Sequence, residues 1–272
     1  MNSNVSAILL RLVPLILLVA ILPACGVTIT PPPPVLLTVA GANSMQPLIR
    51  ALTTAYNAQH PQVTFDIQGG GSQLGQTWVA SARADIGLVA WSPPELGDEL
   101  RLTPVARDAI AIILNTENQL VGLSIAELRD IFRGRLLNWS AVGGASLPIQ
   151  VVSREAGSGT RAVFEAAVMA EQAVTPTAIV LPNSRAVVEF VAENPNAIAY
   201  VSFAFISEGV YGVPIEGVPP TQANLANSSY FLTRELALVT PQESRPEVEQ
   251  FIAFTLSPAG QAIVAERWGR VR

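Results

Sequence analysis

A loop rich in glycine and hydroxyl residues stands between a β-rich run and an amphipathic helix in the segment Val151–Val168, "VVSREAGSGTRAVFEAAV". The first turn of a helix carries backbone N–H groups without partners and a partial positive charge, so such a loop suits an anion. Ser158 and Thr160 add hydroxyl donors, and Arg154 can neutralise a full charge through two parallel hydrogen bonds. These residue types predict an anion-binding loop.

Two upstream segments repeat this layout of strand, polar loop and helix. The run 36–41 leads through Ser44 into an amphipathic helix, and the run 63–68 leads through three glycines and Ser72 into a second helix, predicted over 73–84. Any one of these hydroxyls is most simply explained as a helix N-cap. Three similar junctions, with an arginine at the third, favour one shared anion site.

The same sequence excludes several kinds of chemistry. The third loop lacks the glycine spacing of a dinucleotide-binding fingerprint, and Ser158 is not framed as a hydrolase nucleophile. All 16 basic residues are arginine, which rules out lysine-based catalysis, and a net charge of -5 argues against nucleic acid. One histidine, His60, and one cysteine, Cys25, supply neither a catalytic triad nor a metal cluster. We therefore predict binding without catalysis, no metal site and no cofactor.

The N-terminal segment predicts export and a membrane anchor. The uncharged apolar run 12–24 is too short to span a bilayer comfortably and is typical of a signal peptide. It ends in "LPAC", which resembles the lipobox of bacterial lipoproteins, and a proline-rich stretch follows. We expect a signal peptide over 1–24, then a lipidated Cys25 and an extended tether over 25–35. The alternative is a plain signal peptide with an incidental cysteine.

From Leu36 onward, strands and helices alternate, which is typical of an α/β fold. Several segments, in order, resemble the phosphate-binding proteins of bacterial phosphate ABC importers. The most specific are "LRDIFRGRLLNWSAVGG" and "SREAGSGTR", and "VARDAIAIILN", "NPNAIAYVSF" and "FIAFTLSPAGQAIV" support them. The resemblance covers the chain from Leu36 to its C-terminus.

This resemblance implies a two-lobed class II solute-binding fold, with two hinge crossovers near 106–112 and 230–238. Lobe 1 would comprise 36–108 and 232–272, and lobe 2 would comprise 109–231. The implied function is to capture inorganic phosphate outside the cytoplasm and deliver it to ABC permease subunits, as a membrane-anchored monomer. The alternatives are a binding protein for sulfate, molybdate or tungstate, a phosphate sensor without a transport role, and a phosphoesterase.

The family's ligand-binding residues carry over to matching positions. The resemblance implies hydroxyl donors at Ser44 and Ser72, a backbone N–H donor at Met45 and a charged contact from Arg154. The remaining donors would come from the hydroxyls and backbone of Ser158, Gly159 and Thr160.

One position departs from the family pattern. Ala90 stands where family members carry a carboxylate that accepts the proton of hydrogen phosphate. Asp108, at the first crossover, is our candidate for a replacement acceptor. The alternative for Asp108 is a hydrogen-bonding role at the hinge or strand end.

Overall fold

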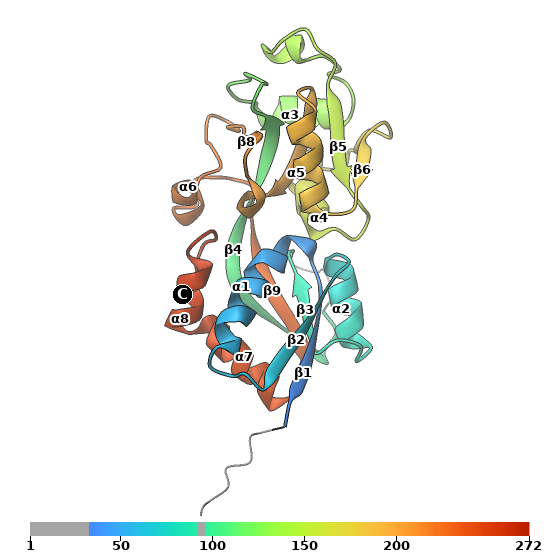
Figure 1. The fold of residues 1–272 in the computed structure, drawn as a ribbon. Helices are drawn as coiled ribbons and strands as arrows, with labels where there is room; N and C mark the ends of the chain where they lie inside the picture. The colour runs from blue at the N-terminus through green and yellow to red at the C-terminus, as the bar shows by residue number, and fades with distance from the viewer. Residues whose placement is uncertain (1–32, 92–95, 272) are drawn as a thin grey trace, which may run out of the picture. The chain divides into compact units, whose positions relative to one another are not determined.

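The computed structural model describes residues 33–91 and 96–271, and residues 34–272 form one compact unit (Figure 1). The predicted signal peptide and Cys25 lie outside the described residues. A nine-stranded sheet runs through the unit in the order β2-β1-β3-β9-β4-β7-β5-β6, and β8 pairs with β4. The fold is therefore α/β, as the alternating pattern of the sequence predicts.

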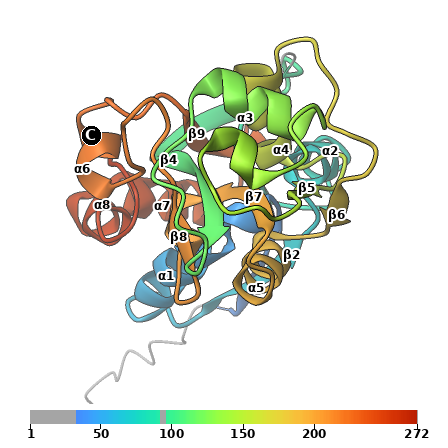
Figure 2. The same cartoon turned by 90° about the horizontal axis from the view of Figure 1, so that it is seen from above.

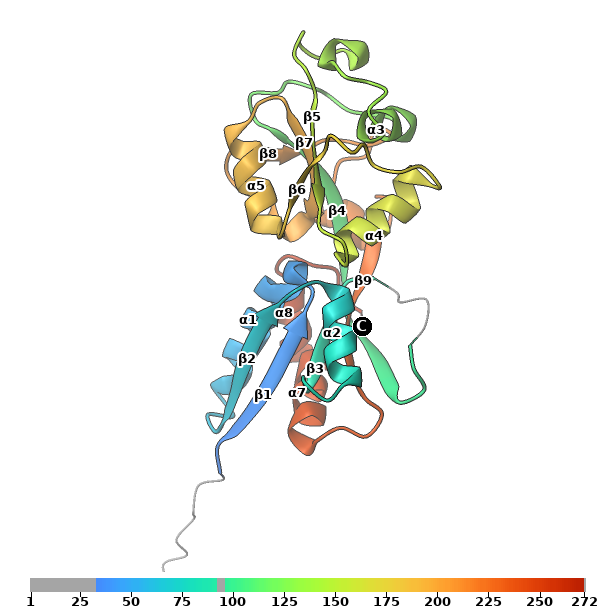
Figure 3. The same cartoon turned by 90° about the vertical axis from the view of Figure 1, so that its right-hand side faces the viewer.

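The first group of strands is parallel and forms one side of the sheet. It contains β1 (Val35–Gly41), β2 (Val63–Gly69) and β3 (Ile86–Val89). Four helices accompany these strands: α1 (Gln46–Asn57), α2 (Ser72–Ala80), α7 (Pro246–Leu256) and α8 (Pro258–Val264). The apolar side chains of α1, α7 and α8 share one core with the strands, and α2 packs on the other face (Figure 3).

Two long strands connect this group to the second one. β4 (Leu100–Asn115) pairs antiparallel with β9 (Thr233–Pro241) as far as Ala109, and from Ile110 it pairs with β7 (Ala197–Ser202). β9 in turn pairs with β3. The change of partner along β4 falls at the first predicted crossover, and β9 begins within the second.

The second group of strands carries its own helices on both faces. Besides β7 it contains β5 (Gln150–Arg154), β6 (Ile179–Leu181) and β8 (Val210–Gly212). Its helices are α3 (Ile125–Phe132), α4 (Gly159–Phe164), α5 (Ser184–Glu193) and α6 (Gln222–Ala226). One core joins α3 and α4 to the sheet, and a second core joins α5 to its opposite face (Figure 2). In the first, the rings of Phe164 and Tyr200 stack with centroids 4.1 Å apart.

One helix differs from the sequence prediction in its length. The second helix, expected over 73–84, ends at Ala80. The Ser81 hydroxyl donates to the carbonyl of Thr77 at 2.8 Å, and Ala82 turns into the left-handed region at φ 54°, so the helical path stops there. α4 has six residues and continues as a π-helical turn over Glu165–Met169.

Candidate functional site

The first two strand–helix junctions lie side by side. β1 and β2 are parallel and in register at Gly41 and Gly69, so both loops leave the sheet at the carboxyl ends of the strands. The backbone N–H of Gly71 donates to the carbonyl of Gly41 at 3.1 Å. A Cβ at Gly69 would collide with the Asn43 side chain, so the loops also touch directly. Parallel pairing therefore brings Ser44 and Ser72 to one end of the sheet.

The second and third junctions also meet. A Cβ at Gly71 would lie 2.6 Å from the carbonyl oxygen of Gly157, and a Cβ at Gly159 would collide with the Ser72 hydroxyl. A side chain at either position would therefore clash. The two loops can approach this closely because glycine has no side chain. All three predicted junctions converge on one place, although they come from distant parts of the chain.

The buried hydroxyls at this place accept hydrogen bonds from protein N–H groups. Ser72 Oγ accepts from the Ala90 N–H at 3.1 Å, Ser158 Oγ from the Arg161 N–H at 3.3 Å, and Thr160 Oγ1 from Arg234 Nη1 at 2.9 Å. Because these partners can only donate, each hydroxyl keeps its own O–H to donate elsewhere. Each of the three hydroxyls therefore has a donor left, which is what an anion site requires.

The N-cap alternative applies to one of the serines. Ser158 is the N-cap of α4, whereas α1 and α2 have no side-chain hydrogen bond at their N-caps. Ser44 is buried in a short 3-10 turn before α1, and its hydroxyl makes no hydrogen bond to another described residue. The N–H of Met45 donates to the carbonyl of Ala42 at 3.0 Å. The structure therefore uses the Met45 donor within the chain.

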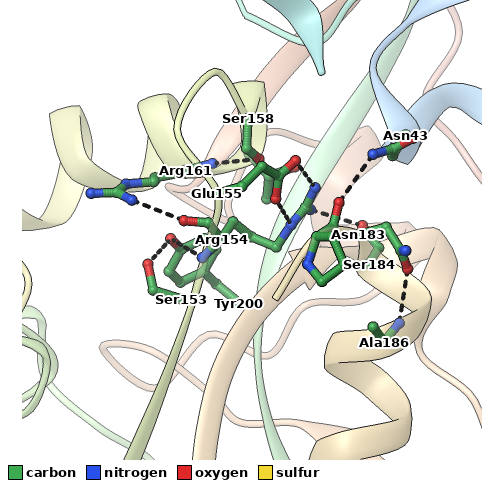
Figure 4. A network of polar contacts seen from close by, with 12 residues as sticks. Asn43, Ser153, Arg154, Glu155, Ser158, Arg161, Asn183, Ser184, Ala186 and Tyr200 are labelled. Carbon is green, nitrogen blue, oxygen red and sulfur yellow. Dashed lines mark hydrogen bonds and ion pairs between the residues drawn. The ribbon is translucent and has the colours of Figure 1, made fainter. Parts of the chain in front are cut away.

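Arg154 ends β5 and is 2% exposed. Its Nε and Nη2 donate to the two carboxylate oxygens of Glu155 at 2.8 and 2.9 Å, and its Nη1 donates to Ser184 Oγ at 3.2 Å (Figure 4). The Tyr200 hydroxyl accepts from the Arg154 backbone N–H at 3.3 Å, and burial raises the pKa of Tyr200 to about 12. The guanidinium is therefore held by Glu155, which directly follows β5, and by Ser184 of α5, while Tyr200 of β7 holds the Arg154 backbone.

A second buried arginine, which the sequence analysis did not single out, lies at the same place. Arg234 forms an ion pair with Asp108 on the neighbouring strand, with Nη2 and Nε at 2.7 and 3.0 Å from Oδ2. Its Nη1 donates both to Thr160 Oγ1 and to the Ala90 carbonyl at 3.4 Å. Burial lowers the pKa of Arg234, the Asp108 charge raises it, and the nearby charge of Arg154 lowers it. Two guanidinium groups therefore converge on the junctions.

Asp108 is fully buried, and protein donors occupy both of its oxygens. Oδ2 accepts from Arg234, and Oδ1 accepts from the Ser202 hydroxyl at 2.9 Å. Burial raises the pKa of Asp108, and the Arg234 charge with these hydrogen bonds opposes that rise. This geometry matches the alternative expected for Asp108, a hydrogen-bonding role at the hinge or strand end.

Among residues 33–91 and 96–271, no three histidine, cysteine, aspartate or glutamate side chains gather as a metal site requires. The helices that the structure describes include none with the length and apolarity of a bilayer span.

Known proteins are similar to this chain in both sequence and fold. Residues 28–259 match the family model described as PBP superfamily domain. The phosphate-binding protein PstS of Bacillus subtilis (strain 168) is 29% identical over 226 residues, which cover 81% of this chain and 75% of the relative. A candidate phosphate ABC transporter substrate-binding protein from Clostridium perfringens, crystallised with bound phosphate, aligns with a TM-score of 0.82 at 32% identity over 87% of this chain and 100% of that one. An ABC-type phosphate transport receptor from Vibrio cholerae aligns with a TM-score of 0.71 at 30% identity over 85% and 97% of the two chains.

Proposed function

Since this chain belongs to the PBP superfamily and, within it, to the binding proteins of phosphate ABC importers, we propose that it captures inorganic phosphate for an ABC transporter. The observation that carries the proposal is the convergence of three strand–helix junctions on the buried Arg154. A tetrahedral oxyanion needs many donors, and this place supplies hydroxyls, helix N-termini and guanidinium groups together.

Arg154 is proposed as the main charged contact. A guanidinium has five N–H donors, and Glu155 with Ser184 uses three of them. One donor each on Nη1 and Nη2 is left, which is the pair that grips two oxygens of one anion. The bidentate Glu155 contact therefore occupies the Nε–Nη2 fork, orients Arg154 and leaves donors on its two terminal nitrogens for the anion.

The remaining contacts are proposed at Ser44, Ser72, Ser158, Gly159 and Thr160. The hydroxyls of Ser72, Ser158 and Thr160 each accept a hydrogen bond within the chain and keep an O–H to donate. Gly159 is the first residue of α4, where backbone N–H groups have no helical partner. Met45 joins the set only if its N–H leaves the Ala42 carbonyl when the anion binds.

Asp108 is better proposed as a positioning residue than as an acceptor. Its oxygens are occupied by Arg234 and Ser202, so it holds Arg234 toward Thr160. The proposed cradle then consists of donors, and Ala90 adds no acceptor for the proton of hydrogen phosphate. This observation favours a second candidate function, the binding of a fully ionised oxyanion such as sulfate, molybdate or tungstate.

The wider role is proposed from the family and from the sequence. Lobe 1 (36–108 and 232–272) and lobe 2 (109–231) would close over the anion, and the closed form would be recognised by ABC permease subunits. Lipidation of Cys25 after removal of 1–24 would keep the monomer at the outer side of the membrane. The proposal includes no catalytic step. The phosphoesterase alternative is tested by incubating the protein with a chromogenic phosphate ester. Release of the chromophore would favour that alternative.

Calorimetric titration of the mature chain with phosphate, sulfate, arsenate, molybdate and tungstate tests the proposal. We expect one anion per chain, and we expect Arg154→Ala to abolish binding. Arg267→Ala is the matched control, because Arg267 is exposed on the C-terminal segment. The absence of binding for all five anions would contradict the proposal, and near-native affinity of Arg154→Ala would show that the site is elsewhere.

A further inference from the structure

A cavity of about 600 Å³ opens between the N-terminal ends of α1 and α5, next to the proposed cradle. It is lined by Asn43, Gln46, Pro47, Arg50, Asn183, Ser184, Arg185 and Phe205. Asn43 Nδ2 donates to the Pro182 carbonyl at 3.2 Å, so the loops before the two helices are already in contact (Figure 4). A volume of this size is far larger than a single phosphate needs and falls in the range of small-molecule sites.

The charge of the lining is one-sided. Arg50 and Arg185 are exposed, and neither forms an ion pair with any residue that the structure describes. No lining residue is acidic, although the whole chain carries a net charge of -5. Two guanidinium groups without acidic partners give this hollow a positive potential that attracts anions.

The helix axes add to this field. Gln46 and Pro47 are the first residues of α1, and Ser184 and Arg185 are the first residues of α5. The helices have 12 and 10 residues, so both are long enough to carry a positive partial charge at these ends. The Asn183 side chain accepts from the Ala186 N–H at 2.9 Å, which leaves other first-turn N–H groups of α5 for a ligand.

We propose that this cavity is a second anion site, separate from the Arg154 cradle, and that it takes a compound with two anionic groups, one for Arg50 and one for Arg185. Two phosphoryl groups in one molecule can offer one anion to each guanidinium fork. Ser184 is the point of contact with the cradle, since its hydroxyl accepts from Arg154 while the residue also lines the cavity. The proposal does not rest on the proposed function, because its charged residues are different.

Inorganic pyrophosphate is the probe for the test. The mature chain is saturated with phosphate and titrated with pyrophosphate by calorimetry, and we expect one further binding event per chain. Arg50→Gln and Arg185→Gln should each weaken it about tenfold or more, since each removes a charge-assisted contact. Arg267→Gln, an exposed arginine outside the cavity, should leave it unchanged. Phosphate affinity should stay the same in all three variants.

The same titration on Arg154→Ala separates the two sites. Pyrophosphate binding should persist there at near-native strength even if phosphate binding is lost. Loss of pyrophosphate binding in Arg154→Ala would mean that the probe occupies the cradle, and the proposal would be wrong. Binding that neither Arg50→Gln nor Arg185→Gln weakens, or no binding at all, would also overturn it.

Discussion

Asp108 and Arg234 face each other directly across β4 and β9, at a register position where both strands pass from one group of strands to the other. Their ion pair is buried, at 2.7 Å between Oδ2 and Nη2, and one nitrogen of the same guanidinium reaches Thr160 and Ala90. Thr160 belongs to α4 and Ala90 follows β3. The pair therefore connects the crossover strands to both sides of the proposed cradle.

Removal of one member of this pair should be far more damaging than removal of both. Arg234→Gln leaves a buried carboxylate without its partner, and we expect a loss of about 3–5 kcal/mol in the free energy of unfolding. The double variant Asp108→Asn/Arg234→Gln should recover much of that loss. Urea unfolding followed by circular dichroism measures both values. Arg101→Gln, which breaks a half-exposed pair with Glu249, is the control and should cost less than about 1 kcal/mol.

Thr160 separates a binding role from a purely structural one. Thr160→Val keeps the shape of the side chain and removes the hydroxyl between Arg234 and the anion, so phosphate affinity should fall by about one order of magnitude or more. Thr160→Ser keeps the hydroxyl and should bind within about threefold of the parent. A Thr160→Val variant that is less stable to heat but binds phosphate normally would show that the hydroxyl serves Arg234 alone.

Gly159 should be intolerant of even one methyl group. In Gly159→Ala the new Cβ collides with the Ser72 hydroxyl and lies 3.1 Å from the Ala90 carbonyl, so the two loops must move apart. We expect calorimetry to find phosphate affinity reduced at least about tenfold, because the donors no longer converge. Gly122→Ala is the matched control, since its nearest neighbour is the Pro214 carbonyl at 3.3 Å, outside the cradle. Equal affinities for the two variants would contradict the packing argument.

Ala90→Asp should change which anion is preferred. The parent cradle offers donors, so we expect its affinities for phosphate and sulfate to lie within about tenfold of each other. A carboxylate at position 90 can accept the proton of hydrogen phosphate and repels sulfate, so the ratio of the two affinities should rise about tenfold or more. Ala90→Asn controls for size without the charge. An unchanged ratio in Ala90→Asp would show that selectivity is decided elsewhere.

Local patterns allowed the junctions to be predicted, but not the partners that cross the sheet. The alternation in 63–68 and the glycines after it identify β2 and its loop, because period and turn chemistry are local properties. Arg154 could be recognised because it stands in the same loop as Ser158. Arg234 could not, since its importance depends on the register between β4 and β9, which brings together residues far apart in the chain. The available indication of this ion pair was that Asp108 and Arg234, which have opposite charges, stand in the two predicted crossovers.

The side-chain roles within the junctions were equally beyond local pattern. The sequence pattern places Ser158 and Ser72 before their helices in the same way. In the structure Ser158 caps α4, whereas Ser72 is the first residue of α2 and accepts from Ala90. Met45 was expected to offer its N–H, but a 3-10 turn directs it to Ala42. These outcomes depend on where each helix begins and on which loop lies beside it, and sequence spacing encodes neither.

The double hydrogen bond of Arg234 Nη1 makes affinity adjustable from a distance. Ala90 and Thr160 lie on opposite sides of the cradle, so separating those sides costs the chain at least one of the two bonds, a difference of about 1–3 kcal/mol for a charged donor. In the proposed two-lobed mechanism, such a difference would change the ratio of closed to open molecules by about one to two orders of magnitude, and the dissociation constant would follow that ratio. We therefore expect substitutions along the crossover strands to change how tightly the protein holds the proposed anion, while every proposed ligand-contacting atom stays the same.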